Sequence, residues 1–244
     1  MIWVDVAVSG ANKRLAFLLD SGAGTTVIDL AAARRLGLKL GRSQSVQGVG
    51  GRTVAYATSG FNASAASVPI SSSPLALDLS GPSAGCGRRI DGLIGADFFR
   101  TRVIQINYAA RSIRLLDRAA TDALPGDILP LTFRSDALCA RISINGNKPE
   151  WLRLDTGCNT ALEWVIGKRG ANTLPQTTIG LHAGSARETI TDVTLGTRQV
   201  TGVKTGIHAS PMFAGESGLI GNGLLSRFTV TIDARGRRCV LSAR

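Results

Sequence analysis

Residues 17–28 read FLLDSGAGTTVI: an apolar run, a carboxylate at Asp20, a hydroxyl and a glycine. A short strand that ends in an Asp-Ser-Gly turn is common loop chemistry, so this stretch alone decides little. The same order of parts returns in residues 151–162, WLRLDTGCNTAL, which places Asp155 at an offset of 135 from Asp20. The recurrence indicates that one structural unit is present twice.

A second motif recurs downstream of each of these turns. Residues 91–97 read DGLIGAD and residues 217–223 read SGLIGNG, at an offset of 126. The same offset aligns the alternating apolar residues of 104–115 with those of 230–241. Two motifs in the same order, with a constant register after the second, predict an internal duplication. The chain of 244 residues is therefore expected to form two lobes of roughly 120 residues each.

Together, the paired motifs resemble those of the aspartic proteases, in which each lobe supplies one catalytic aspartate on an Asp-Ser/Thr-Gly turn. The stretch 20–38 is most similar to bacterial retropepsin-like proteases, whereas two lobes in one chain resemble the pepsin arrangement. The resemblance implies an all-β fold of two lobes, related by a pseudo-twofold axis, with a few short helices. We expect an N-terminal lobe at 1–118, with the first aspartate and a flap, and a C-terminal lobe at 119–244 with the second.

The activity implied by this resemblance is that of an aspartic endopeptidase, with Asp20 and Asp155 as the catalytic pair. Two adjacent carboxylates share one proton because their like charges oppose double ionisation. The ionised member accepts a proton from water, and the protonated member polarises the substrate carbonyl. Aspartic proteases are the general example of such a pair. Which of the two residues carries the proton stays open at this point.

Two other functions share parts of this pattern. A catalytically inactive peptide-binding module would keep the same fold, but intact carboxylates in both turns argue against it. A one-lobe retropepsin fused to an unrelated domain would lack the second pair of motifs, which are present at 155–157 and 218–221. We therefore favour a single-chain peptidase, with the inactive binding module as the alternative.

The residues that follow each aspartate have roles implied by the resemblance. Ser21 and Thr156 are expected to donate hydrogen bonds across the boundary between the lobes, which would fix the carboxylates in one plane. Gly22 and Gly157 are expected to direct backbone N–H groups at the carboxylates, where a side chain would crowd the turn.

The next position in each turn bears on the pH dependence. Ala23 and Cys158 stand where pepsin-like enzymes often carry a hydroxyl that faces the outer carboxylate oxygen. Loss of a donor to the ionised form raises the pKa of a carboxyl group. We therefore expect an activity optimum nearer mildly acidic than strongly acidic pH.

A psi-shaped loop is implied beneath each aspartate turn. The residues of these two loops are Gly92, Leu93, Ile94 and Gly95 in the first lobe and Gly218, Leu219, Ile220 and Gly221 in the second. Both segments are also expected to be buried apolar turns.

Residues 45–55 predict a hairpin with a glycine-rich tip, which the resemblance would make the flap over the substrate. The residues of the flap tip are Gly48, Val49, Gly50 and Gly51. Glycine permits the backbone freedom that a lid needs, although an ordinary exposed hairpin gives the same pattern. Tyr56 is the candidate for a flap tyrosine. A weaker counterpart in the second lobe is residues 179–191, with its turn around 183–185.

Apolar alternation and turn residues predict the elements around these motifs. The expected hairpins join 3–9 to 15–19 and 140–144 to 151–154, the second through Asn145-Gly146-Asn147. The expected helices are 28–38 and a shorter counterpart at 161–168, with single turns at 97–99 and 223–225. A surface excursion is expected at 71–87 and the connection between the lobes at 118–128.

Composition limits the partners. The chain carries 28 Lys and Arg against 17 Asp and Glu, a formal net charge of +11. These positive residues are dispersed and form no stripe with interleaved aromatics, which favours solubility over nucleic-acid binding. No apolar run approaches the ~20 residues needed to span a bilayer. We expect an extended polypeptide substrate, no nucleic acid, no membrane span and a monomer.

No cofactor and no metal are expected, because Cys86, Cys139, Cys158 and Cys239 show no metal-ligand spacing. Buried free thiols are expected for the last two, and disulfide pairing stays open. His182 and His208 fit no catalytic triad and are expected at the surface. No signal peptide is visible, since residues 1–4 lead directly into a strand pattern. A periplasmic or secreted location is implied only by resemblance to exported bacterial relatives.

Overall fold

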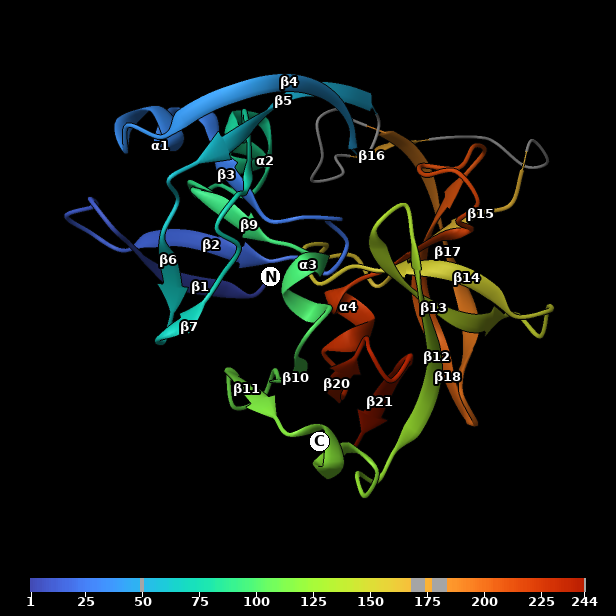
Figure 1. Cartoon of the computed structure of the whole chain (residues 1–244). Helices are drawn as coiled ribbons and strands as arrows, with labels where there is room; N and C mark the ends of the chain where they lie inside the picture. The colour runs from blue at the N-terminus through green and yellow to red at the C-terminus, as the bar shows by residue number, and fades with distance from the viewer. Residues whose placement is uncertain (49–50, 168–173, 177–183, 244) are drawn as a thin grey trace.

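The computed structural model describes residues 1–48, 51–167, 174–176 and 184–243. Within these ranges the chain forms a nine-stranded and a twelve-stranded sheet with a few short helices. Figure 1 shows two bodies, one on each side of the molecule, above a shared base. We call the body built on the nine-stranded sheet lobe one, and the body built on strands β12 to β19 lobe two.

Lobe one contains nine strands in the order β4-β5-β8-β3-β9-β2-β1-β6-β7. Their bounds are β1 Trp3–Val8, β2 Leu15–Leu19, β3 Val27–Asp29, β4 Lys39–Gly48, β5 Gly51–Ser59, β6 Ala63–Ala65, β7 Val68–Pro69, β8 Leu75–Leu77 and β9 Gly92–Ile94. Its helices are α1 Leu30–Arg35, α2 Ser80–Gly85 and α3 Ala96–Phe99.

The second sheet has the strand order β11-β10-β20-β21-β12-β13-β14-β19-β15-β18-β17-β16. Its bounds are β10 Val103–Asn107, β11 Ser112–Leu116, β12 Asp127–Arg134, β13 Ala137–Ile144, β14 Glu150–Leu154, β15 Leu162–Val165, β16 Leu174–Gln176, β17 Gly184–Leu195, β18 Arg198–His208, β19 Gly218–Ile220, β20 Thr229–Asp233 and β21 Arg238–Ser242. The helices of this half are η1 Arg118–Thr121, a 3₁₀ turn, and α4 Asn222–Leu225.

The duplication predicted from the motifs is visible in strand pairing. In lobe one, β9 runs parallel to β2 and antiparallel to β3, and in lobe two β19 runs parallel to β14 and antiparallel to β15. Gly218 shows why this arrangement needs glycine: its φ is +148°, and a side-chain carbon there would collide with the main-chain oxygen of Glu163. The recurring Gly-Leu-Ile-Gly segments are therefore the middle strands of two equivalent three-stranded units.

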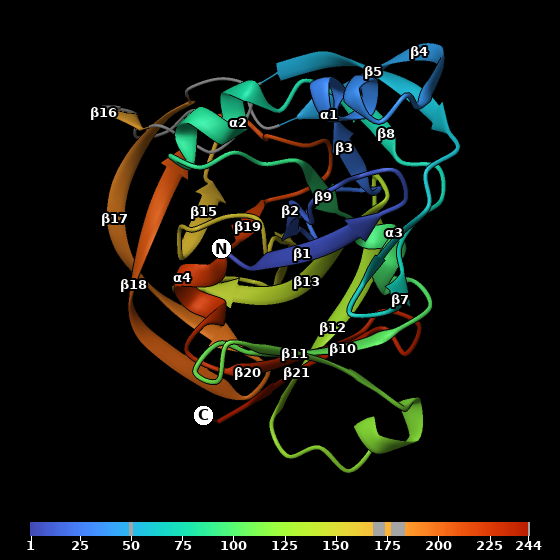
Figure 2. The ribbon, with the colours of Figure 1, turned by 90° about the vertical axis from the view of Figure 1, so that its left-hand side faces the viewer.

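The two halves meet in one continuous sheet at the base, where β10 pairs antiparallel with β20 (Figure 2). The register places Gln105 opposite Thr231, and these two positions are equivalent under the offset of 126. Gln105 Nε2 donates a hydrogen bond to Thr231 Oγ1 at 3.2 Å. A pseudo-twofold axis therefore passes through this pair.

One departure from that symmetry lies at the edges of the base. Strand β12 pairs with the outer edge of β21, and Cys239 and Leu241 of β21 are fully buried. The equivalent β11 is the end strand of its sheet within the described residues, and there Ile113 and Leu115 are 37% and 44% exposed. The base is thus symmetric in its four strands β11-β10-β20-β21, and asymmetric because β12 extends the sheet beyond β21 alone.

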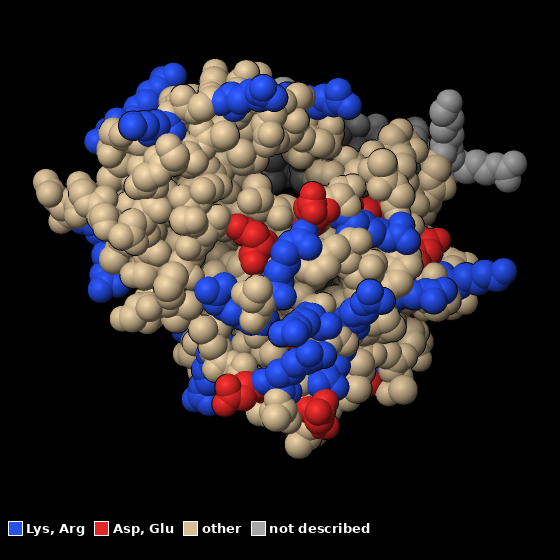
Figure 3. Space-filling model, in the orientation of Figure 1, with Lys and Arg blue, Asp and Glu red and all other residues tan. Residues whose placement is uncertain are grey.

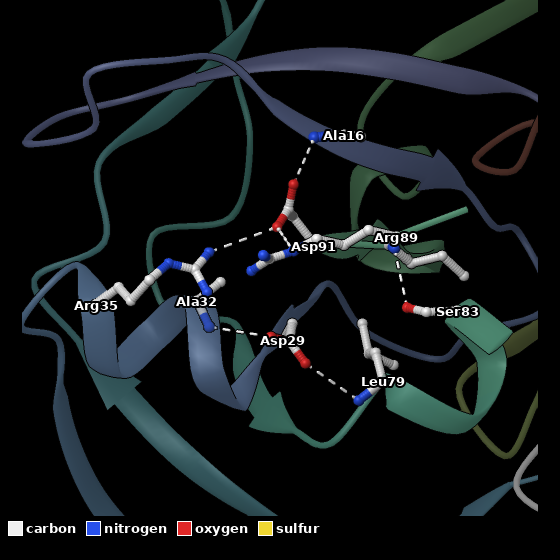
Figure 4. A network of polar contacts seen from close by, with 9 residues as sticks. Ala16, Asp29, Ala32, Arg35, Leu79, Ser83, Arg89 and Asp91 are labelled. Atoms are coloured by element: carbon white, nitrogen blue, oxygen red, sulfur yellow. Dashed lines mark hydrogen bonds and ion pairs between the residues drawn. The ribbon is translucent and has the colours of Figure 1, made fainter. Parts of the chain in front are cut away.

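A polar network supports the middle strand of lobe one (Figure 4). Asp91, directly before β9, accepts hydrogen bonds from Ala16 N at 3.1 Å and Arg89 Nε at 2.8 Å. Asp29 caps α1 by accepting from Ala32 N at 3.0 Å, and it also accepts from Leu79 N at 3.2 Å. Asp29 N donates to the Asp91 carbonyl oxygen at 2.8 Å, so these bonds tie α1, β9 and the segment before α2 to one another.

The two hairpins are confirmed as β1–β2 and β13–β14. In the second, Asn145 and Gly146 both adopt positive φ, as the central residues of a type I′ turn do, and Asn147 N donates to the Ile144 carbonyl oxygen at 3.0 Å. The single turns at 97–99 and 223–225 correspond to α3 and α4. The helix expected at 28–38 is shorter, because Asp29 caps it at one end and Gly37, with φ +67°, follows the other.

Other expectations were wrong. The helix expected at 161–168 is wrong for Leu162–Val165, which form strand β15 because they pair with both β18 and β19, and residue 168 lies outside the described residues. The surface excursion expected at 71–87 is wrong for β8, which lies between β3 and β5, whereas helix α2, which follows it, has no buried residues. In lobe two, Gly184 and Ser185 belong to strand β17 rather than to a turn, and 179–183 lie outside the described residues.

Candidate active site

Each aspartate follows directly after an inner strand of its lobe. Asp20 succeeds β2, and its N–H donates to the Ile94 carbonyl oxygen at 2.9 Å. Asp155 succeeds β14, and its N–H donates to the Ile220 carbonyl oxygen at 2.9 Å. The middle strand of each three-stranded unit therefore fixes where the aspartate leaves the sheet.

The two turns approach each other so closely that each glycine lies against the carboxyl group of the other lobe. A side-chain carbon on Gly22 would lie 2.6 Å from Cγ of Asp155, and one on Gly157 would lie 2.6 Å from Cγ of Asp20. Contacts that short are not tolerated between carbon atoms. Glycine is thus required twice, and the two carboxyl groups are brought together from positions far apart in the sequence.

Four hydrogen bonds join the turns across the lobe boundary. Ser21 Oγ donates to the Leu154 carbonyl oxygen at 2.5 Å, and Thr156 Oγ1 donates to the Leu19 carbonyl oxygen at 2.8 Å. Each hydroxyl oxygen also accepts from the other residue's N–H, at 3.0 Å from Ser21 N and 3.2 Å from Thr156 N. Both hydroxyl groups are fully buried, so their partners hold the two turns in one arrangement.

Backbone donors face both carboxyl groups. Gly22 N and Ala23 N each donate to Asp20 Oδ1 at 3.0 Å, and Gly157 N donates to Asp155 Oδ1 at 2.9 Å. Burial nevertheless raises the pKa of Asp20 above its ordinary value. Burial also raises the pKa of Asp155 well above its ordinary value, and the adjacent Asp20 charge adds to the effect. The pair therefore retains a proton at pH values where isolated aspartates are ionised.

Comparison with known proteins agrees with this geometry. Residues 4–98 match the sequence model of a family described as aspartyl protease. The crystal structure of an aspartic proteinase from Irpex lacteus is similar with a TM-score of 0.59 and 13% sequence identity, over 99% of this chain and 93% of that chain. The chain has the bilobal aspartic protease fold. No curated protein sequence matches it.

In this aspartic protease fold, both aspartates line a cavity of about 640 Å³ between the lobes. The space-filling view shows the recess beneath the arch of β4 and β5 (Figure 3). Hairpin residues Val46, Gln47, Gly48 and Thr53 contribute to the lining. Gly51 pairs with Gly48 in the hairpin, whereas Val49 and Gly50 lie outside the described residues.

The lobe-one wall of the cavity is apolar. It is formed by Leu18, Val27, Leu75, Leu77, Leu79, Pro82, Ile90 and Leu93. Most of these residues belong to a small core cluster separate from the main one. Of the psi-loop residues, Leu93 and Leu219 reach the cavity, whereas Gly92 packs against Phe17 and Gly218 against the main chain of Glu163 in the neighbouring strands. At the loop ends, Gly95 N donates to Thr26 Oγ1 at 3.2 Å and Gly221 N to the Ala161 carbonyl oxygen at 3.1 Å.

The lobe-two wall carries a buried ion pair that sequence reasoning missed. Arg153, only 4% exposed, donates to both carboxylate oxygens of Glu216 at 2.7 and 2.6 Å. Its third donor, Nη1, reaches across to the Gly22 carbonyl oxygen at 2.7 Å, and its guanidinium carbon lies 3.4 Å from the Phe213 ring centroid. The sequence feature that could have revealed this ion pair is the basic residue Arg153 within the apolar strand before Asp155, at the position where lobe one has Leu18.

Several sequence-based assignments lie elsewhere. Tyr56 is absent from the cavity lining and packs against the main core. His208 was expected at the surface, which is wrong: it is buried, with Nε2 2.6 Å from Glu163 Oε2. His182 lies outside the described residues. All four cysteines are free thiols, and of the two expected to be buried, Cys239 is buried whereas Cys158 is only partly buried.

Positive charge does not concentrate at the recess. On the face shown in Figure 3, Lys and Arg lie along the upper arch and, more densely, below the recess towards the base, with a few acidic residues among them. Among the described residues, no cluster of His, Cys, Asp and Glu has the arrangement of a metal site. None of the helices that the structure describes has the length and apolar character needed to traverse a bilayer.

Proposed function

We propose that this chain is an aspartic endopeptidase that hydrolyses peptide bonds with a water molecule activated between Asp20 and Asp155. The observation that carries the proposal is the reciprocal packing of each turn glycine against the other carboxyl group. A single chain supplies both aspartates, one from each of the proposed lobes 1–118 and 119–244. The active unit is therefore proposed to be a monomer.

The reaction follows from one shared proton. The ionised carboxylate accepts a proton from water, whose oxygen attacks the scissile carbonyl carbon, while the protonated carboxyl group donates its proton to the carbonyl oxygen. In the collapse of the tetrahedral intermediate the C–N bond breaks, and a carboxyl proton passes to the leaving nitrogen. The hydrogen bonds that join the two turns would supply orientation, which is a large part of the rate enhancement in such a site.

The substrate is proposed to be an extended polypeptide that lies across both lobes. The β4–β5 hairpin would act as a flap, with Gly48, Val49, Gly50 and Gly51 at its tip, because its residues already line the cavity over the aspartates. The apolar wall of lobe one favours a large apolar substrate side chain on that side of the scissile bond. Nucleic acid is not a proposed partner.

Cleavage of a peptide library, read by mass spectrometry, tests the proposal. Wild type should cleave at a restricted set of bonds and should be inhibited by a statine-type compound, whereas Asp20→Asn and Asp155→Asn should lose activity. Asp117→Asn is the matched control, because Asp117 is an exposed aspartate that does not line the cavity. Peptide binding without cleavage by wild type would instead support the inactive binding module, and wild-type turnover by either active-site variant would exclude the mechanism.

A further inference from the structure

The two halves of the site are not equivalent at the residue two positions before each aspartate. In lobe one this residue is Leu18, part of the apolar wall. In lobe two it is Arg153, whose three hydrogen bonds reach Glu216 and the main chain of lobe one. A buried charged side chain at a place where its counterpart is apolar needs partners to offset its desolvation. The partners of Arg153 connect it to the pair of carboxyl groups, Asp20 and Asp155, which we call the dyad.

The contacts of Arg153 form a chain that ends on Asp20. Arg153 Nη1 donates to the Gly22 carbonyl oxygen at 2.7 Å, and Ala23 N donates to Asp20 Oδ1 at 3.0 Å. This carbonyl and this N–H belong to one planar peptide group, in which they point in opposite directions. A guanidinium group on the carbonyl therefore fixes the orientation of the N–H towards Asp20, and it strengthens that donor by polarising the peptide.

The corresponding peptide group of lobe two acts differently. Ala23 N and Cys158 N each donate to the main-chain oxygen of the aspartate in their own turn, at 3.2 and 3.3 Å. Of these two, Ala23 N alone also reaches the carboxyl group, and Gly157 N is the one backbone donor to the Asp155 carboxyl group among the described residues. The Asp20 carboxyl group thus receives two backbone donors, one of them oriented by Arg153. Donors of this kind stabilise the ionised form of a carboxyl group.

We propose that Arg153 and Glu216 are a positioning pair that makes Asp20 the ionised member of the dyad and leaves the shared proton on Asp155. The inference rests on the proposed function, because it assigns the roles of base and acid within the same site. Asp20 then accepts the proton from water, and Asp155 donates to the substrate carbonyl. Neither Arg153 nor Glu216 needs to touch the reacting atoms.

Other charged groups around the cavity do not account for this asymmetry. Asp97 accepts from Thr26 Oγ1 at 2.8 Å, and at the rim Arg100 and Asp136 form an ion pair of 2.8 Å. The Cys158 thiol is neutral at the mildly acidic pH expected for activity, because burial and the neighbouring Asp155 raise its pKa to about 12. The charge of Arg153 lowers the pKa of both Asp155 and Asp20 and is offset by Glu216, so this charge does not by itself distinguish the two carboxyl groups. The selective effect of Arg153 on Asp20 acts through the oriented peptide group.

The test compares wild type with the double variant Arg153→Met/Glu216→Met. Replacement of both partners removes the guanidinium group that orients the Gly22–Ala23 peptide and leaves no unpaired buried charge. The double variant is therefore expected to fold. The matched control is Arg198→Met/Asp127→Asn, which removes a 2.7 Å ion pair that is remote from the cavity lining. If the double variant fails to fold, Arg153→Lys is used, since it keeps the charge but loses the planar set of donors.

Two readouts separate this inference from the proposed function. Carbon-13 NMR of labelled aspartate carboxyl groups, assigned with Asp20→Asn and Asp155→Asn, reports protonation whether or not the protein cleaves peptides. We expect Asp20 to ionise at lower pH than Asp155 in wild type and in the control, and the Asp20 titration to move up by about one pH unit in the double variant. The acidic limb of the kcat/KM profile should move with it.

Ionisation of Asp155 before Asp20 in wild type would overturn the inference. An unchanged Asp20 titration in the double variant, or in Arg153→Lys where that replaces it, would also overturn it, whatever happens to activity. A peptidase-negative wild type with the expected NMR behaviour would instead reject the proposed function and leave the assignment of charge intact.

Discussion

Gly22 and Asp155, far apart in the sequence, are so close that a single added carbon would bring them into collision. A side-chain carbon on Gly22 would lie 2.6 Å from Cγ of Asp155 and 2.8 to 2.9 Å from its two oxygens. The mirror relationship holds between Gly157 and Asp20. The small size of these glycines, rather than an unusual φ, is what the site requires.

Gly22→Ala should therefore displace the Asp155 carboxyl group. Misplacement of a catalytic group by about 1 Å can reduce the rate by about 100-fold, so we expect a loss of at least that size in kcat/KM. Steady-state cleavage of a fluorogenic peptide measures it. Gly41→Ala is the control, because an added carbon at Gly41 meets only ordinary contacts of 3.6 and 3.8 Å. Full activity in Gly22→Ala would contradict the geometry of the site.

The hydroxyls of Ser21 and Thr156 should contribute to stability. Thr156→Ala removes the donor to the Leu19 carbonyl oxygen and the acceptor of Ser21 N, and both of these groups are buried. Loss of buried partners of this kind costs about 1 to 3 kcal/mol of unfolding free energy, which urea denaturation measures. Thr156→Ser keeps both bonds and should recover most of the loss. Equal destabilisation by Ala and Ser would mean that packing, not hydrogen bonding, is responsible.

The hairpin β4–β5 offers a direct test of the flap. Val46 lines the cavity, whereas Val54 on the adjacent strand does not and is 52% exposed. Val46→Asp should raise KM because it places a charge against the substrate, and Val54→Asp should leave kinetics close to wild type. Similar effects of the two substitutions on KM would show that the hairpin does not cover the substrate.

Stability should also depend on pH through the dyad. Because burial raises the pKa of both carboxyl groups, the folded state binds more protons than the unfolded chain between the ordinary aspartate value of 3.8 and the raised values. The free energy of unfolding should therefore fall as pH rises through that window. Asp155→Asn should flatten this slope in urea titrations at several pH values. A slope unchanged by the substitution would place its origin elsewhere.

The same shifts determine the pH range of activity. The dyad works while it holds one proton, so activity is lost at low pH when the second proton binds and at higher pH when the last one leaves. Raised pKa values move both limits upwards. We expect a mildly acidic optimum, and a profile that peaks below about pH 3, towards the lower values known for such pairs, would contradict the account.

Prediction from the sequence succeeded where a steric or backbone requirement at one position restricts the residue type and so produces a recognisable motif. The Gly-Leu-Ile-Gly segments repeat because their glycine positions have no room for a side chain, and the hairpin turn shows Asn145-Gly146 because both residues need positive φ. The bilobal fold could therefore be inferred before any coordinates.

Prediction from the sequence failed where contacts between residues far apart in the chain determine the secondary structure or the partners of a side chain. The sequence of 161–168 looks helical, but β18 and β19 on either side impose a strand on Leu162–Val165. His208 looked unremarkable, because its partner Glu163 is 45 residues away and adjacent only in the folded chain. Arg153 and Glu216 were missed for the same reason: an ion pair across 63 residues has no sequence signature.

The measurement that tests the central claim most directly is a double-mutant cycle at the dyad. Single-turnover cleavage of one peptide would be compared for wild type, Asp20→Asn, Asp155→Asn and the double variant. If the two carboxyl groups act as one unit, each single variant should lose at least about 1,000-fold, and the double variant should be no worse than the singles. Losses that multiply in the double variant, or a single variant that cleaves at the wild-type rate, would show that the two aspartates do not share the reaction.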